Sequence, residues 1–242
     1  VTLAAYRQNA QDRNIALVSR INPHVGDIAI DYAKDVLPLT PTGSATERHI
    51  IAAYVNKSLK IFSGDKLTAY WSGLLGLDKE KTAALLADRP TMEDKVRSKL
   101  AKRGGFGYEQ PSEKTFPPME DFCAWVKSCG AIPMESWLDG TSAGEKDAQA
   151  LLECSVAKGT QCFSIVPDRN WNIKDAEQKA VKVANLRKVV QLCDAMELPI
   201  NIGTEMNKGG LPFVDDLNGP VLSEFKRSFI RGAQVMVGHA VC

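Results

Sequence analysis

The feature that most constrains this fold is a run of three short apolar segments in the second half of the chain. They begin near residues 131, 161 and 199, and each is followed by a pattern of helical period. Spacings of about 30 to 40 residues are typical of right-handed β/α crossovers. Because a helix is too long for a hairpin connection, we expect the three strands to be parallel neighbours.

We therefore predict an α/β protein in which residues 119–242 form a parallel β/α barrel-like domain of the irregular TIM type. Three strands cannot close a barrel, so we expect this domain to be incomplete within the 242 residues. A chain that starts at Val1 rather than Met adds to the expectation that it is a piece of something longer.

The first part of the chain has a different pattern. Residues 1–103 carry apolar positions at helical spacing, separated by Gly and Pro, and we predict a helical subdomain or insertion. The place most open to a strand is DIAIDY, where Ile28 and Ile30 alternate with polar or small residues. The Gly- and Pro-rich residues 104–118 are the expected connector.

The composition indicates which classes of partner to expect. Thirty basic and 29 acidic residues leave a net charge of +1, which gives no electrostatic footprint for nucleic acid. No apolar run approaches the roughly 20 residues that span a bilayer. The six cysteines lack disulfide or zinc-finger spacing. We expect a cytoplasmic protein with a small-molecule partner and neither a nucleic-acid nor a membrane partner; the oligomeric state stays open.

Polar residues follow each predicted strand, at the end where parallel α/β folds collect function. They are Glu135 and Asp139 after the first strand, Asp168, Arg169 and Asn170 after the second, and Glu205 and Asn207 after the third. A turn or a helix cap would equally explain Asp139 and Asp168. A carboxylate such as Glu205 at the end of an apolar strand needs a cation, a donor or water. Together these residues predict a pocket with several carboxylates and one guanidinium.

Two of these segments resemble the PHP family, the polymerase-and-histidinol-phosphatase type of metal-dependent phosphoesterase, whose members are irregular β/α barrels. CGAIPMESWLDG is similar to the family strand that delivers a histidine, although Ser136 or Trp137 stands in its place. LPINIGTEMN is similar to the late strand that supplies the last two metal ligands. On that alignment Glu205 matches an aspartate and Asn207 a histidine.

The resemblance implies metal-dependent hydrolysis, above all of a phosphate ester in a small phosphorylated substrate, with a divalent metal (Mn, Mg or Zn). On that alignment Glu205 and Asn207 are the metal ligands. For the other candidates we expect Asp139 and Asp168 to be further ligands or the general base, Arg169 to hold an anionic substrate group in the catalytic site, and Glu135 and Asn170 to contact the substrate. Two alternatives remain. One is a non-catalytic, degenerate barrel that binds a sugar or an anion, and the other is a sugar isomerase-like barrel.

Overall fold

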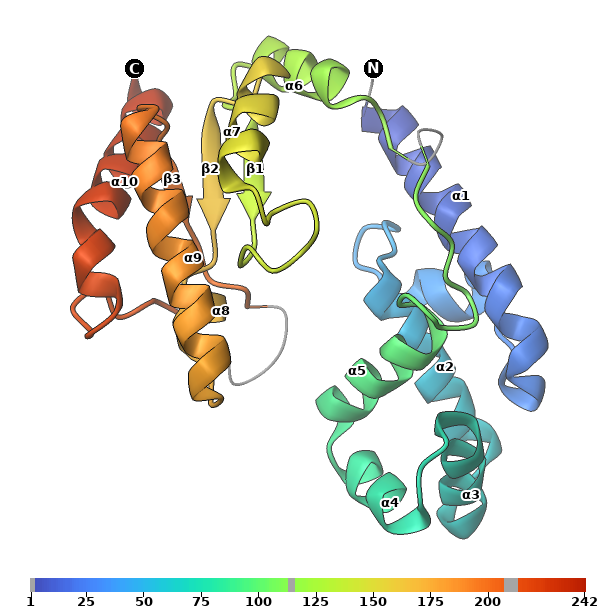
Figure 1. Ribbon diagram of the computed structural model, residues 1–242. Helices are drawn as coiled ribbons and strands as arrows, with labels where there is room; N and C mark the ends of the chain where they lie inside the picture. Colours follow the sequence, from blue (N-terminus) through green and yellow to red (C-terminus); the bar gives the residue numbers. More distant parts are fainter. Residues whose placement is uncertain (1–2, 113–115, 207–212) are drawn as a thin grey trace. The chain divides into compact units, whose positions relative to one another are not determined.

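The computed structural model describes residues 3–112, 116–206 and 213–242 (Figure 1). The chain divides into two compact units, Val1–Pro117 and Pro118–Cys242, here called unit 1 and unit 2. Each is described by itself. Within the described residues, no helix is both long enough and apolar enough to cross a membrane.

Unit 1 is built of helices. They are α1 (Leu3–Ile21), α2 (Glu47–Ile61), α3 (Gly64–Leu75), α4 (Lys79–Ala87) and α5 (Arg89–Leu100), with short helical turns at Asn22–His24, Gly26–Ile28, Tyr32–Val36 and Leu37–Leu39. The DIAIDY segment thus forms turns rather than a strand. Its alternation reflects the burial of Ile28 and Ile30 in the core, not the pairing of a strand.

Local sequence sets the helix ends in unit 1. The Thr46 side chain and the His49 ring form a reciprocal capping box at the start of α2. The Asp78 carboxylate accepts a hydrogen bond from the backbone N–H of Lys81 and caps α4. Gly76, with a φ of 68°, ends α3 in the left-handed conformation that glycine adopts without strain.

The core of unit 1 lies between these helices and includes polar groups that have partners. Trp71 is fully buried, and its indole Nε1 donates to the Ser58 hydroxyl at 3.0 Å. The buried Tyr54 hydroxyl donates to Asn22 Oδ1 at 2.9 Å. Satisfying such groups avoids the free-energy penalty of an unpaired buried donor.

Unit 2 alternates strands and helices. Its elements are α6 (Met119–Ser128), β1 (Met134–Trp137), α7 (Ala148–Ala157), β2 (Cys162–Ile165), α8 (Asp168–Trp171), α9 (Ala176–Ala195), β3 (Ile200–Ile202), a short turn at Leu222–Phe225 and α10 (Lys226–Val241). The strands lie at the expected places and run parallel in the order β1-β2-β3, as predicted (Figure 1).

The predicted TIM-type barrel is wrong. Among the described residues, the three parallel strands form one open sheet, and the greater part of the chain is helical. Strand-helix repeats specify parallel neighbours and crossovers, but they do not specify how many strands follow. Closure requires a strand number, tilt and shear that match, and three short strands do not provide them.

The two faces of this sheet differ in chemistry. Trp137, Phe163, Ile165 and Ile200 pack in one hydrophobic cluster with side chains of α7, α9 and α10. Successive residues of a strand point to opposite faces. The intervening residues, such as Ser136, therefore lie on the other face.

Helix α10 approaches β3 very closely, and a glycine makes this possible. A Cβ added at Gly232 would lie 1.8 Å from the backbone oxygen of Ile200. No rotamer relieves such a clash, because the backbone fixes the position of a Cβ and the oxygen belongs to the backbone. Phe229, on the same helix, is buried in the same hydrophobic cluster as Trp137 and Phe163.

Candidate ligand-binding site at the carboxyl edge of the sheet

A row of polar side chains crosses the second face of the sheet. Ser136 of β1 is in register with Ser164 of β2, and Ser164 is in register with Asn201 of β3. Ser136 is exposed, and the other two are partly exposed. Neither serine hydroxyl has a hydrogen-bond partner among the described residues. We call Ser136, Ser164 and Asn201 the polar row.

The loop after β1 is organised by two carboxylates. Glu145 is buried and accepts hydrogen bonds from the backbone N–H groups of Leu138 at 2.7 Å and Gly140 at 3.2 Å. Asp139 accepts from the backbone N–H of Thr141 at 3.0 Å and pairs with Lys182 Nζ at 2.9 Å. These contacts fix the loop at the carboxyl end of the strand.

The contacts of Asp139 decide its charge. Burial acts to raise the pKa of this carboxyl, but the hydrogen bonds from Thr141 and Lys182 outweigh it and hold the pKa below its usual value. Asp139 is therefore an ionised group engaged in a turn and an ion pair. This arrangement matches the turn interpretation of Asp139, and a general base would need a freer carboxylate.

Asn170 connects the ends of β1 and β2. The residue is fully buried, and its Nδ2 donates to the backbone oxygens of Leu138 at 3.0 Å and Val166 at 3.2 Å. Its Oδ1 is buried without a hydrogen-bond partner among the described residues. Because Nδ2 already serves two acceptors, turning the amide would not help. A buried acceptor such as this Oδ1 usually has a hydrogen-bond donor, and none of the described residues provides one.

Asp168 lies beside Asp215 from the loop after β3. The Oδ1 atom of Asp215 is buried without a hydrogen-bond partner in the described part of the chain. Burial and then repulsion from Asp168 raise the pKa of Asp215. The Asp168 carboxylate itself accepts from Asn172 Nδ2 at 3.0 Å.

The structure also brings Arg169 and Glu205 together. Their side chains form an ion pair of 2.9 Å between Nη1 and Oε2, and both are partly exposed. Asn207 lies outside the described residues. Glu135 is half-buried, on the face of Trp137 rather than that of the polar row. Burial and then repulsion from Glu145 raise its pKa.

These residues do not fit a divalent metal. In the described parts of the chain, no group of three or more His, Cys, Asp or Glu side chains is placed to hold one. Of the two predicted ligands, Glu205 already has the Arg169 guanidinium as its cation. We therefore derive no chemical step through a metal.

None of the three members of the polar row was a candidate site residue from the sequence, although Ser136 was noted as a residue that stands where the family strand has a histidine. A signal was present, since CFSI and INI each alternate a polar with an apolar residue. The alternation assigns each side chain to a face. It does not give the register that places Ser164 and Asn201 beside Ser136.

Comparison with protein-family models, with curated proteins and with solved structures finds no match to this chain. The resemblance of the strand ends to the PHP family therefore stays a prediction, and the interpretation of the site depends on its own geometry.

Proposed function

We propose that unit 2 binds a small polyhydroxylated molecule, of the size and chemistry of a monosaccharide, over the polar row and the adjoining carboxyl edge. This is the non-catalytic sugar-binding alternative from the sequence, on an open sheet. The observation that carries it is the register of Ser136, Ser164 and Asn201 across three strands.

The polar row is an unusual surface for a parallel sheet. Such sheets are almost always covered on both faces, and their strands are usually apolar throughout. Neighbouring strands lie about 4.8 Å apart, so three of them present polar groups over roughly 10 Å. That width suits a single sugar ring. Each serine hydroxyl both donates and accepts, as the hydroxyls of a sugar do.

The charges at the carboxyl edge favour a neutral hydroxylated ligand over an anion. The cations Arg169 and Lys182 are each paired with a carboxylate. Among the described residues, the buried atoms without hydrogen-bond partners include two acceptors, Asn170 Oδ1 and Asp215 Oδ1. A sugar hydroxyl would donate to such an acceptor, whereas an anion would be repelled by it.

The test is an NMR titration of the isotope-labelled 242-residue protein with D-glucose, D-ribose, myo-inositol and, separately, inorganic phosphate. We expect at least one of the hydroxylated compounds to shift the backbone signals of Ser136, Ser164 and Asn201 with a dissociation constant of about 1 to 10 mM. Ser164→Ala removes one hydroxyl and should weaken that binding roughly fivefold.

The matched control is Ser223→Ala, an exposed serine of unit 2 outside the polar row, which should leave the affinity unchanged. The proposal fails if phosphate binds at the polar row and none of the three hydroxylated compounds does. It fails equally if Ser164→Ala and Ser223→Ala bind alike, or if no compound shifts these signals at about 50 mM.

A further inference from the structure

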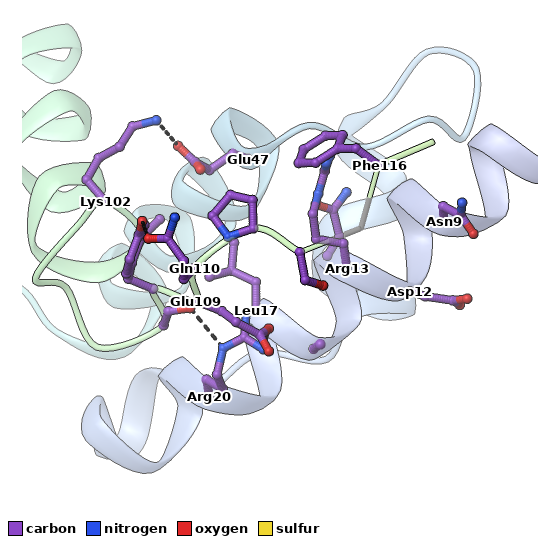
Figure 2. Close-up of a pocket in the computed structure, with 17 residues that line it drawn as sticks. Asn9, Asp12, Arg13, Leu17, Arg20, Glu47, Lys102, Glu109, Gln110 and Phe116 are labelled. Atoms are coloured by element: carbon purple, nitrogen blue, oxygen red, sulfur yellow. Dashed lines mark hydrogen bonds and ion pairs between the residues drawn. The ribbon is translucent and has the colours of Figure 1, made fainter. Parts of the chain in front are cut away.

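Unit 1 contains an open groove of about 720 Å³, which none of the residues discussed for unit 2 enters. Ligand sites typically measure about 300 to 1,000 Å³. Helix α1 forms one wall, and the segment 107–112 forms the other (Figure 2). Gly107 allows this close approach, because a Cβ there would lie 2.6 Å from the side chains of Leu17 and Ile21. Arg20 Nε donates to the backbone oxygen of Gly107 at 2.9 Å and fixes the second wall.

Several charged groups that line the groove already have partners. Arg20 pairs with Glu109 at 2.7 Å, and Lys102 pairs with Glu47 at 3.2 Å (Figure 2). Arg13 differs from these residues. Its guanidinium lies over the ring of Phe116 at 5.3 Å from the centroid, and none of the described carboxylates pairs with it.

Stacking on a ring prepares Arg13 for a ligand. A guanidinium held over a ring by a cation–π contact keeps its N–H donors for other partners. This arrangement suits a carboxylate, which accepts two parallel hydrogen bonds from an arginine.

Asn14, the next residue of α1, supplies a second and independent polar group. Its side chain is 97% buried, since its exposed fraction is 3%, yet the residue lines the groove. Its Nδ2 donates to the backbone oxygen of Ala45 at 2.8 Å, which fixes the amide. No donor among the described residues reaches its Oδ1. The groove is thus lined by a buried amide, held by Ala45, and by a guanidinium without a carboxylate partner among the described residues.

We propose that this groove binds the C-terminal residue of an extended peptide. The terminal carboxylate accepts hydrogen bonds from Arg13, and the amide N–H of the last peptide bond donates to Asn14 Oδ1. Both protein residues line the same groove, where a single residue of the ligand would contact them. An apolar side chain of the ligand contacts Leu17 and Pro111 in the groove.

The test uses calorimetric titration of the 242-residue protein with acetyl-Ala-Ala-Leu as the free acid and as the C-terminal amide. The free acid should bind roughly tenfold more tightly, because only it carries the charge that Arg13 recognises. Arg13→Gln should remove this difference without affecting the fold, since Arg13 is exposed. A depsipeptide acid, with an ester oxygen in place of the last N–H, should bind roughly fivefold more weakly than the peptide acid.

Arg103→Gln is the matched control, because Arg103 is an exposed arginine of unit 1 that does not line the groove. It should leave the preference for the free acid intact. Equal affinity of acid and amide, no effect of Arg13→Gln, or no binding of the acid at about 10 mM would each overturn the proposal. None of these results bears on sugar binding by unit 2.

Discussion

The two units differ in how they treat polar groups that folding removes from water. In unit 1 the buried hydroxyl of Tyr54 and the buried indole of Trp71 each donate to a side chain in the core. In the described part of unit 2, several buried atoms have no hydrogen-bond partner. Trp137 Nε1, Asn170 Oδ1, Trp171 Nε1 and Asp215 Oδ1 lie at or after the carboxyl ends of the strands, and Thr160 Oγ1 lies before β2.

This difference indicates where each unit binds its ligand. A buried polar group without a partner lowers stability by about 1 to 3 kcal/mol, so several of them at one edge suggest that a ligand or water completes the site. In unit 1 the polar groups of the core stabilise the fold, and the groove that we propose as a binding site lies on its surface. Substitutions in the core of unit 1 and in the sheet of unit 2 therefore test this difference between the units.

The largest effect is expected at the contact between α10 and β3. Gly232→Ala places a Cβ 1.8 Å from the Ile200 oxygen and forces backbone atoms apart. We expect unit 2 to lose about 3 kcal/mol of unfolding free energy, while unit 1 is unchanged. Urea unfolding followed by hydrogen exchange and mass spectrometry reports on the two units separately.

Gly238→Ala is the control for this change. It lies on the same helix with nothing within 4 Å of the added Cβ, so it should alter stability by less than about 1 kcal/mol. Equal effects of the two variants would show that close packing of α10 on β3 does not hold unit 2 together.

The same contrast explains how much of the structure was predictable from the sequence. Strand positions followed from short apolar runs, and the helices of unit 1 from apolar spacing. The barrel prediction was wrong, because closure depends on the number of strands, and local sequence patterns do not give that number. In the site, Asp139, Asp168, Arg169 and Glu205 were recognisable as polar residues after strands.

Their partners were not recognisable. The pairing of Asp139 with Lys182 and of Asn170 with Leu138 joins residues that lie far apart in the chain. Only tertiary packing brings them together. The groove of unit 1 was missed for the same reason, since it forms where residues 107–112 fold back against α1.

An effect of intermediate size on stability is expected in the core of unit 1, where buried polar groups have hydrogen-bond partners. Ser58→Ala removes the acceptor of the Trp71 indole, in a residue that is itself fully buried. The buried indole N–H of Trp71, left without an acceptor, should lower the unfolding free energy of unit 1 by about 1 to 2 kcal/mol. Ser98→Ala, an exposed serine of the same unit, is the control and should be nearly neutral. If both variants unfold at the same urea concentration, the hydrogen bond to Trp71 contributes nothing and the contrast between the units is lost.

The smallest effect, and the one with the opposite sign, concerns Asp215. Because burial and then repulsion from Asp168 raise its pKa above the unfolded value of 3.8, the charged form destabilises the folded state. The contribution of this carboxyl to the stability of unit 2 should therefore become less unfavourable as the pH falls from neutrality toward 3.8, because the folded carboxyl takes up a proton before the unfolded one does. Asp215→Asn removes the charge and keeps the shape of the side chain. It should stabilise unit 2 at neutral pH by less than about 1 kcal/mol, since the group is partly exposed and solvent screens it. The advantage over the native chain should shrink as the pH falls and vanish below 3.8. Unfolding free energies at a series of pH values measure this, with Asp216→Asn, at the exposed neighbouring position, as the control that keeps the native slope. If the unfolding free energy of Asp215→Asn changes with pH as that of the native chain does, the charged Asp215 carboxylate does not destabilise the folded state.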